Sequence, residues 1–169
     1  MKPIHMWSVV VLSVACCAMI SAASETVNVD GRAAAFGVPS AQMPSTREAG
    51  ARAPIDAFFK AFNARDSNAL RLTLHYPHVR INEAGGVNVW QTAADANTDF
   101  AALTRAEGWA RSTLDSVAMR QNDDVKVHFD VVFSRYKADG TKYATYQSLW
   151  IVTKKNGAWG VQARSSFAP

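Results

Sequence analysis

The stretch His75-Tyr76-Pro77-His78-Val79-Arg80-Ile81-Asn82-Glu83 marks the point where a helical pattern ends and a strand-like pattern begins. Pro77 disfavours helical geometry in the residue before it, so the preceding helix has to stop here. From residue 78 to residue 82, polar and apolar side chains alternate, which is typical of a half-buried strand. The chain therefore passes from helices to a sheet at this proline.

Two helices are expected before that point. Between residues 49 and 65, apolar side chains recur at helical spacing, and Pro54 suits a first turn; these side chains are Ile55, Phe58, Phe59 and Phe62. Asp66 or Ser67 can cap a second, short helix that runs to Leu74. Both helices end before the first expected strand.

The sequence after Pro77 predicts a sheet with one helix inserted. Residues 78–82 and 87–91 flank Gly85-Gly86 and form an expected hairpin. Thr92 is expected to cap a third helix that ends near Gly108. Four strands follow, with Asn156-Gly157 as the turn between the last two, over residues 109–119, 125–136, 143–154 and 159–167. The order α-α-β-β-α-β-β-β-β predicts an α+β fold in which a curved antiparallel or mixed sheet wraps the helices as a cone.

Composition is that of a single folded domain. The chain has 169 residues, of which 49% are hydrophobic and 19% are charged. This length suits one domain with a substantial core. The formal net charge is +4, but the basic residues are scattered, whereas a nucleic-acid-binding protein usually shows a basic cluster. We therefore expect no nucleic-acid partner.

The N-terminal segment predicts export. Lys2 is followed by an apolar run over residues 7–20 and by Ser21-Ala22-Ala23, the pattern of a signal peptide cut after residue 23. Two alternatives stay open, an uncleaved anchor and lipidation at Cys16 or Cys17. Cleavage would leave a periplasmic or secreted protein without a stable membrane anchor, with a flexible leader over 24–48 and a folded domain over 49–169.

Cysteine and metal chemistry are not indicated. Both cysteines lie in the predicted signal, so the mature chain would have no thiolate zinc site and no cysteine nucleophile. The remaining possible metal ligands show no compact spacing, and they are His75, His78, Glu83, His128 and Asp130. We expect neither a metal nor a cofactor.

The order of elements, the Ala61-Phe62-Asn63-Ala64-Arg65-Asp66 stretch and the tryptophan in the last hairpin carry a family resemblance. From about Ala49 to Pro169 the chain resembles the nuclear transport factor 2-like superfamily, which includes ketosteroid isomerases and SnoaL-like cyclases. The resemblance implies a cone-shaped domain with a mostly apolar pocket at one end, often in a homodimer.

Two positions depart from the isomerase pattern. The tyrosine that the family places on its first helix falls at Phe58, which has no hydroxyl group. The aspartate that serves as general base falls at Asn82, which does not accept a proton at neutral pH. The family's oxyanion hole therefore cannot be assigned residue by residue.

Three residues are candidates for proton transfer. His78 is a possible proton carrier, Glu83 stands next to the position of the missing base, and Asp130 lies centrally in a long strand. His78 shares a strand face with Arg80 and Asn82, either at the pocket mouth or on the solvent face of an edge strand. Asp130 either faces solvent or is held by Arg111, Arg164 or a histidine.

The candidate ligand contacts combine large aromatic side chains with arginines: Tyr76, Arg80, Asn82, Trp90, Trp109, Trp150 and Arg164. Around Trp150, both faces of the predicted strand carry large apolar groups, which suggests a second subunit against one of them. We expect a homodimer whose pocket binds a small, partly apolar ligand through Arg80 or Arg164, without a clear catalytic set. The alternative is a SnoaL-like or isomerase-type enzyme that uses His78, Glu83 or Asp130.

Overall fold

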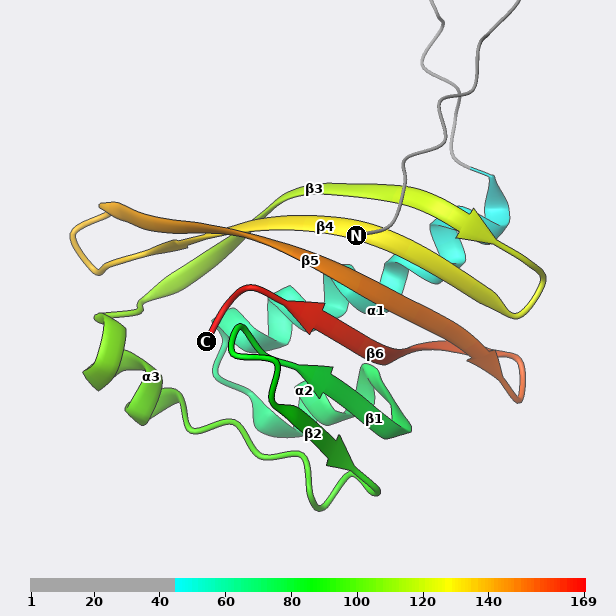
Figure 1. Cartoon of the computed structure of the whole chain (residues 1–169), viewed down its shortest axis with the longest axis horizontal. Coiled ribbons are helices and arrows are strands. Elements are labelled where there is room, and N and C mark those ends of the chain that lie inside the picture. Colours follow the sequence, from blue (N-terminus) through cyan, green and yellow to red (C-terminus); the bar gives the residue numbers. More distant parts are fainter. Residues whose placement is uncertain (1–44) are drawn as a thin grey trace, which may run out of the picture. The chain divides into compact units, whose positions relative to one another are not determined.

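The computed structural model describes residues 45–169, so the predicted signal peptide and most of the predicted leader lie outside the described residues. The element order matches the expected one (Figure 1). The elements are α1 (Thr46–Asn63), α2 (Ser67–Leu72), β1 (Leu74–Ile81), β2 (Val87–Trp90), α3 (Phe100–Glu107), β3 (Arg111–Asn122), β4 (Lys126–Tyr136), β5 (Lys142–Lys155) and β6 (Ala158–Ser166). The predicted α+β fold is confirmed.

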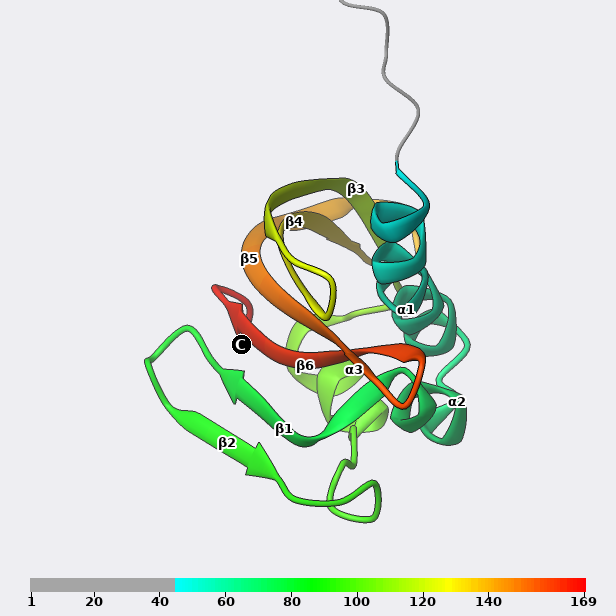
Figure 2. The same cartoon turned by 90° about the vertical axis from the view of Figure 1, so that its right-hand side faces the viewer.

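The sheet is mixed and strongly curved. Its strand order is β2-β1-β6-β5-β4-β3. β1 runs parallel to β6, and the other neighbouring strands pair antiparallel. The sheet does not close into a barrel, and Figures 1 and 2 show it bending around α1. One face of the sheet therefore covers the helices and the other face turns away from them.

The two expected hairpins are confirmed. In the first, Ile81 of β1 lies opposite Val87 of β2. In the second, Asn156 and Gly157 both have positive φ, 51° and 83°, as a two-residue type I′ turn requires. Because this turn matches the right-handed twist of the strands, it sets the register of β5 against β6.

Two helices start at residues other than the expected ones. α1 starts at Thr46, since the Ser45 side chain accepts a hydrogen bond from the Glu48 amide, so Pro54 lies inside the helix and not in its first turn. α3 starts only at Phe100, capped by Asp99. Thr92 does not cap it, because its amide and hydroxyl groups donate to the Asp95 carboxylate in a separate turn.

β1 begins earlier than the sequence predicted, at Leu74 and not at residue 78. α2 is correspondingly shorter and ends at Leu72. The Tyr76–Pro77 peptide bond is cis, and the register between β1 and β6 shifts between Leu74 and Val79. The proline is therefore accommodated within an irregular strand and does not simply precede it.

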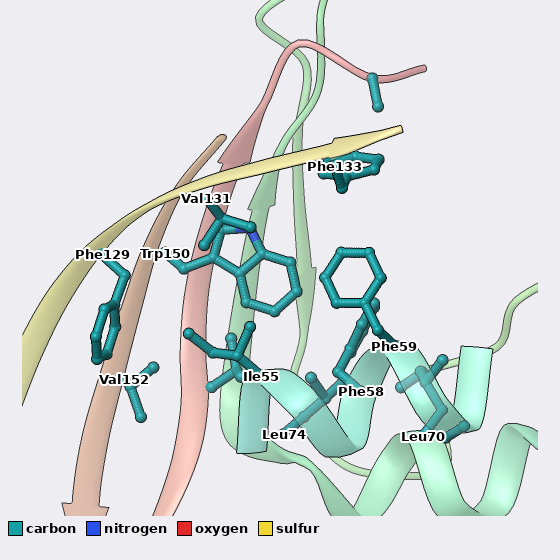
Figure 3. Close-up of a cluster of buried hydrophobic side chains, with 14 of the residues drawn as sticks. Ile55, Phe58, Phe59, Leu70, Leu74, Phe129, Val131, Phe133, Trp150 and Val152 are labelled. Carbon is teal, nitrogen blue, oxygen red and sulfur yellow. The ribbon is translucent and has the colours of Figure 1, made fainter. Parts of the chain in front are cut away.

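The core lies between α1 and the concave face of the sheet (Figure 3). Ile55, Phe58 and Phe59 of α1 are buried against Trp150 of β5 and Phe133 of β4. The alternating side chains of β4 that were expected in the core are buried, namely Val127, Phe129, Val131 and Phe133. This apolar packing holds one end of α1 close to the sheet and leaves a cavity beside it.

Candidate functional site

A cavity of about 380 Å³ lies between the concave face of the sheet, α1 and α3. Its apolar wall consists of aromatic rings from the four elements α1, β2, β4 and β5, namely Phe58, Phe59, Phe62, Trp90, Phe133 and Trp150. Three arginines, Arg80, Arg135 and Arg164, also line it. The volume lies within the range of about 300–1,000 Å³ that small-molecule pockets occupy.

The guanidinium of Arg164, on β6, lies in the cavity between three aromatic rings, Phe58, Trp90 and Trp150, which we call the aromatic box. Its guanidinium carbon lies 4.6 Å from the ring centre of Phe58, 5.4 Å from that of Trp150 and 5.9 Å from that of Trp90. These are cation–π distances. Burial and, to a smaller extent, the nearby charge of Arg80 lower the pKa of Arg164 to about 9. The side chain is still protonated at neutral pH.

His78 of β1 holds Arg164 from the side. The Arg164 Nε–H donates to His78 Nε2 over 3.2 Å, and the His78 Nδ1–H donates to the carbonyl of Val161 over 2.9 Å. The imidazole is fully buried and stacks on Trp90 at 5.3 Å. Burial lowers the pKa of His78 to about 3; the charge of Arg164 acts in the same direction, and the Val161 carbonyl opposes it. His78 is thus neutral at pH 7, with both ring nitrogens engaged.

Arg80 lies on the same face of β1 as His78 and next to Arg164 in the parallel register. Its Nη2 donates to the main-chain oxygens of Ala168 and Pro169, over 3.2 and 2.7 Å. Burial lowers the pKa of Arg80, Glu83 opposes this shift, and the charge of Arg135 adds to it. The sequence left open whether the polar face of β1 lies at the pocket or faces solvent. In the structure, His78 and Arg80 on this face point inward, toward the cavity.

The third arginine of the cavity, Arg135, is neutralised by a neighbouring carboxylate. Its Nη1 donates to both carboxylate oxygens of Glu107, over 2.8 and 2.6 Å, and the Tyr143 hydroxyl donates to the same carboxylate over 2.8 Å. The two charged side chains are only 7% and 17% exposed. Burial and the Glu107 carboxylate raise the pKa of Tyr143. This pair ties the end of α3 to the sheet.

Three of the expected ligand contacts lie outside the cavity lining. Trp109 is fully buried in the core and donates its indole N–H to the Ser112 hydroxyl over 3.0 Å. The Asn82 side chain accepts hydrogen bonds from the backbone of the β1–β2 turn. The Tyr76 hydroxyl donates to the Arg71 carbonyl over 3.1 Å. These three side chains have structural partners, while Arg80, Trp90, Trp150 and Arg164 line the cavity.

The three candidates for proton transfer are not brought together. Glu83 is exposed in the turn between β1 and β2. Asp130 lies on the outer side of the sheet and pairs with Arg120, with 2.5 Å between Oδ2 and Nε, so neither Arg111, Arg164 nor a histidine holds it. Neither carboxylate lines the cavity, whereas His78 lies beside it. Proton transfer by these residues stays a prediction.

Sequence reasoning missed part of the cavity. The alternation of buried side chains in β4 continues past Phe133 to Arg135, which is 5% exposed, so the pattern itself placed an arginine on the core face. Glu107 had no such signal, because its partner Arg135 lies 28 positions away on another element. The contribution of α3 depends on how the loop before it folds back.

Within residues 45–169, no group of three potential metal ligands of the His, Cys, Asp or Glu type comes together. In the same range, no helix is both long and apolar enough to cross a membrane. The polar chemistry of the described cavity therefore rests on arginines, the Glu107 and Asp99 carboxylates, and small hydroxyl and amide groups.

The chain matches a family model described as NTF2-like protein (DUF6841) over residues 47–166. A search among curated proteins found no significant match. The matched range contains every described helix and strand except the first residue of α1.

Solved structures share the fold at low sequence identity. One is a protein of unknown function with a cystatin-like fold from Nostoc punctiforme, with a TM-score of 0.61, 11% identity and coverage of 76% of this chain and 95% of that one. An NTF2-like protein with a cystatin-like fold from Novosphingobium aromaticivorans has a TM-score of 0.59, 12% identity and coverage of 72% and 81%. A ketosteroid isomerase-like protein from Erwinia carotovora atroseptica has a TM-score of 0.51, 19% identity and coverage of 75% and 100%.

Proposed function

We propose, from the premise that this chain belongs to the NTF2-like family DUF6841, that its domain binds a small, partly apolar molecule in the cavity beside α1. One observation carries the proposal: the cavity has a wall of six aromatic rings and polar groups at a few defined points. Pockets of this composition bind ligands by burying apolar surface, while a few polar groups fix the orientation.

The packing around the cavity supports a preformed site. Phe58 and Phe59 pack on Trp150 with ring centres 5.0 and 5.8 Å apart. Phe58 also stacks on Phe62 at 5.8 Å. Because these rings belong to the hydrophobic core, the wall is held in place without a ligand, and binding does not have to order it.

A cavity-filling substitution tests this proposal. Ala102 and Ala101 are neighbours on α3, but only Ala102 lines the cavity. The neutral probe 2-naphthylacetamide, at ten times its Kd, is expected to raise the Tm of the wild-type protein by about 4 °C. The same rise is expected for Ala101→Trp and not for Ala102→Trp, whose indole occupies the space. Differential scanning fluorimetry measures this, and an equal rise in both variants would contradict the proposed site.

The alternative function, proton transfer through His78, Glu83 or Asp130, remains a prediction. Enolisable ketones are the substrates to test, with His78→Gln, Glu83→Gln and Asp130→Asn as variants. The hydrogen bonds of both His78 nitrogens favour binding over proton transfer at this residue.

A second copy of the chain is proposed to cover the outer face of the sheet. This face carries exposed apolar side chains on β1, β2 and β5, namely Ile81 (37% exposed), Val87 (62%), Val89 (47%) and Leu149 (41%). Apolar residues that gather on one sheet face favour association, since their burial removes them from water. The interface would lie opposite the cavity, so that both subunits keep their ligand sites.

Leu149→Glu is expected to convert the dimer to a monomer, because it places a carboxylate near Asp130 in the middle of the apolar face. Leu72→Glu is the matched control, since Leu72 is 87% exposed on α2, away from the sheet. Size-exclusion chromatography with light scattering measures the mass of each variant. A wild-type protein that stays monomeric at all concentrations would contradict the dimer.

A further inference from the structure

We infer that the ligand of this cavity is an organic anion, a carboxylate on an apolar body of one or two rings, and that Arg164 recognises the carboxylate. This inference rests on the proposed function and adds the chemical class of the ligand. It follows from the distribution of charges in the cavity, from the free donors of Arg164 and from the way His78 holds this arginine.

The charges lining the cavity are unevenly compensated. Three arginines and two carboxylates, Glu107 and Asp99, line it. Glu107 forms an ion pair with Arg135. The Asp99 side chain caps α3, where it accepts a hydrogen bond from the Ala102 amide over 2.7 Å. Arg80 donates to the main-chain oxygens of Ala168 and Pro169, and among residues 45–169 Arg164 has no carboxylate within ion-pair distance. The side of the cavity around Arg164 therefore carries excess positive charge, which favours an anionic ligand.

The free donors of Arg164 match a carboxylate. A guanidinium has five N–H donors, one on Nε and two on each Nη atom. The Nε–H is occupied by His78, and within the described residues no acceptor takes a hydrogen bond from either Nη atom. The two Nη atoms present parallel donors, which is the geometry that binds both oxygens of a carboxylate. A single neutral carbonyl oxygen would use only part of this set.

His78 acts as a positioning residue for Arg164. It accepts from the Arg164 Nε–H, and its own Nδ1–H is fixed by the Val161 carbonyl. Its stacking on Trp90 keeps the ring plane in place. A flexible arginine side chain loses rotamer entropy when it binds a ligand, and this arrangement removes part of that loss beforehand. The guanidinium is thereby held in one orientation inside the aromatic box.

The aromatic rings around Arg164 define the rest of the ligand. Phe58, Trp90 and Trp150 surround the guanidinium and continue into the apolar wall. A carboxylate bound to Arg164 would therefore point its apolar body along these rings. In surroundings of low polarity, a charge-assisted hydrogen bond is stronger than in water, which increases the preference for an ionised group.

A matched pair of probes separates the anion from the apolar body. Isothermal titration calorimetry with 2-naphthylacetate and 2-naphthylacetamide compares an ionised carboxylate with a neutral group on the same rings. We expect the acid to bind the wild-type protein about 30-fold more tightly than the amide, the size of one charge-assisted contact. Equal affinities would overturn this inference and leave the proposed function standing. No binding of either probe would overturn both.

Variants then assign the preference to a residue. Arg164→Gln is expected to reduce the ratio of acid affinity to amide affinity to about 1, while the amide still binds. Arg111→Gln is the control, since it removes an exposed positive charge outside the cavity, and it is expected to leave this ratio at about 30. His78→Phe keeps an aromatic ring but removes the acceptor, and an intermediate ratio is expected. A full preference in Arg164→Gln would overturn the assignment.

Arg164→Gln is also expected to fold. Burying a cation without a counter-ion costs stability, so its removal is expected to leave Tm unchanged or raised. If the variant does not fold, the comparison of acid and amide in the wild-type protein decides the chemical class by itself. His78→Phe, through a change in the ratio at unchanged amide affinity, then decides whether Arg164 carries the preference.

Discussion

Trp150→Ala is expected to lower the free energy of unfolding by about 3–5 kcal/mol, the usual cost of deleting a large buried aromatic side chain. Trp150 is 2% exposed and packs against Phe58 and Phe59 of α1. Its indole N–H donates to the Ser148 hydroxyl over 2.8 Å. The substitution would enlarge the cavity and detach the sheet from α1, since this ring bridges the two.

Urea unfolding followed by circular dichroism measures this loss. Trp159→Ala is the matched control, because Trp159 undergoes the same chemical change at a half-buried position near the β5–β6 turn. We expect less than half the loss there, since less apolar surface leaves water at this position on folding. Equal losses in the two variants would contradict the larger contribution expected for Trp150.

Glu107→Ala is expected to lower the free energy of unfolding by about 3–5 kcal/mol, because it leaves the charge of Arg135 buried and unpaired. Arg135 is 5% exposed, and its Nε already lacks a hydrogen-bond partner within the described residues. The Tyr143 hydroxyl would lose its acceptor as well. Because Glu107 ends α3, the same variant is expected to loosen this wall of the cavity.

A double-mutant cycle distinguishes a buried ion pair from general damage. Glu107→Leu combined with Arg135→Met replaces both charges by apolar groups and is expected to recover most of the stability lost in Glu107→Leu alone. The exposed pair of Arg120 and Asp130 serves as comparison, and Asp130→Asn is expected to cost less than about 1 kcal/mol. Additive losses at Glu107 and Arg135 would contradict the coupling. Urea unfolding provides all four free energies.

Much of the architecture followed from local signals. The change of pattern around Pro77 predicted the passage from helices to strands, which the structure places three residues earlier, at Leu74. Alternation in β4 predicted the buried face of that strand. Asn156-Gly157 predicted a tight hairpin, which has the positive φ angles expected for that turn. Such signals are readable because they depend on residues within a few positions of one another. The start of α3 was misjudged because Thr92 and Asp99 are both good caps, and local pattern does not rank them.

The cavity depended on long-range contacts. His78 and Arg164 are 86 positions apart in the chain, and they meet because β1 lies parallel to β6. Arg135 and Glu107 meet through the placement of α3 at the end of β4. No spacing rule predicts such pairs, since the strand order is set by the packing of the whole sheet.

The stretch from His75 to Glu83 shows the division between the two levels. Its sequence by itself determined that His78, Arg80 and Asn82 share one face of a strand and that Val79 and Ile81 share the other, because side chains alternate along any strand. Only the tertiary structure decided that the polar face points inward, with His78 buried and Ile81 37% exposed. The physical reason is that alternation shows which residues share a face but not which of the two faces is buried. In β1 this is decided by pairing with the partner strand β6 and by packing against the aromatic rings around Arg164.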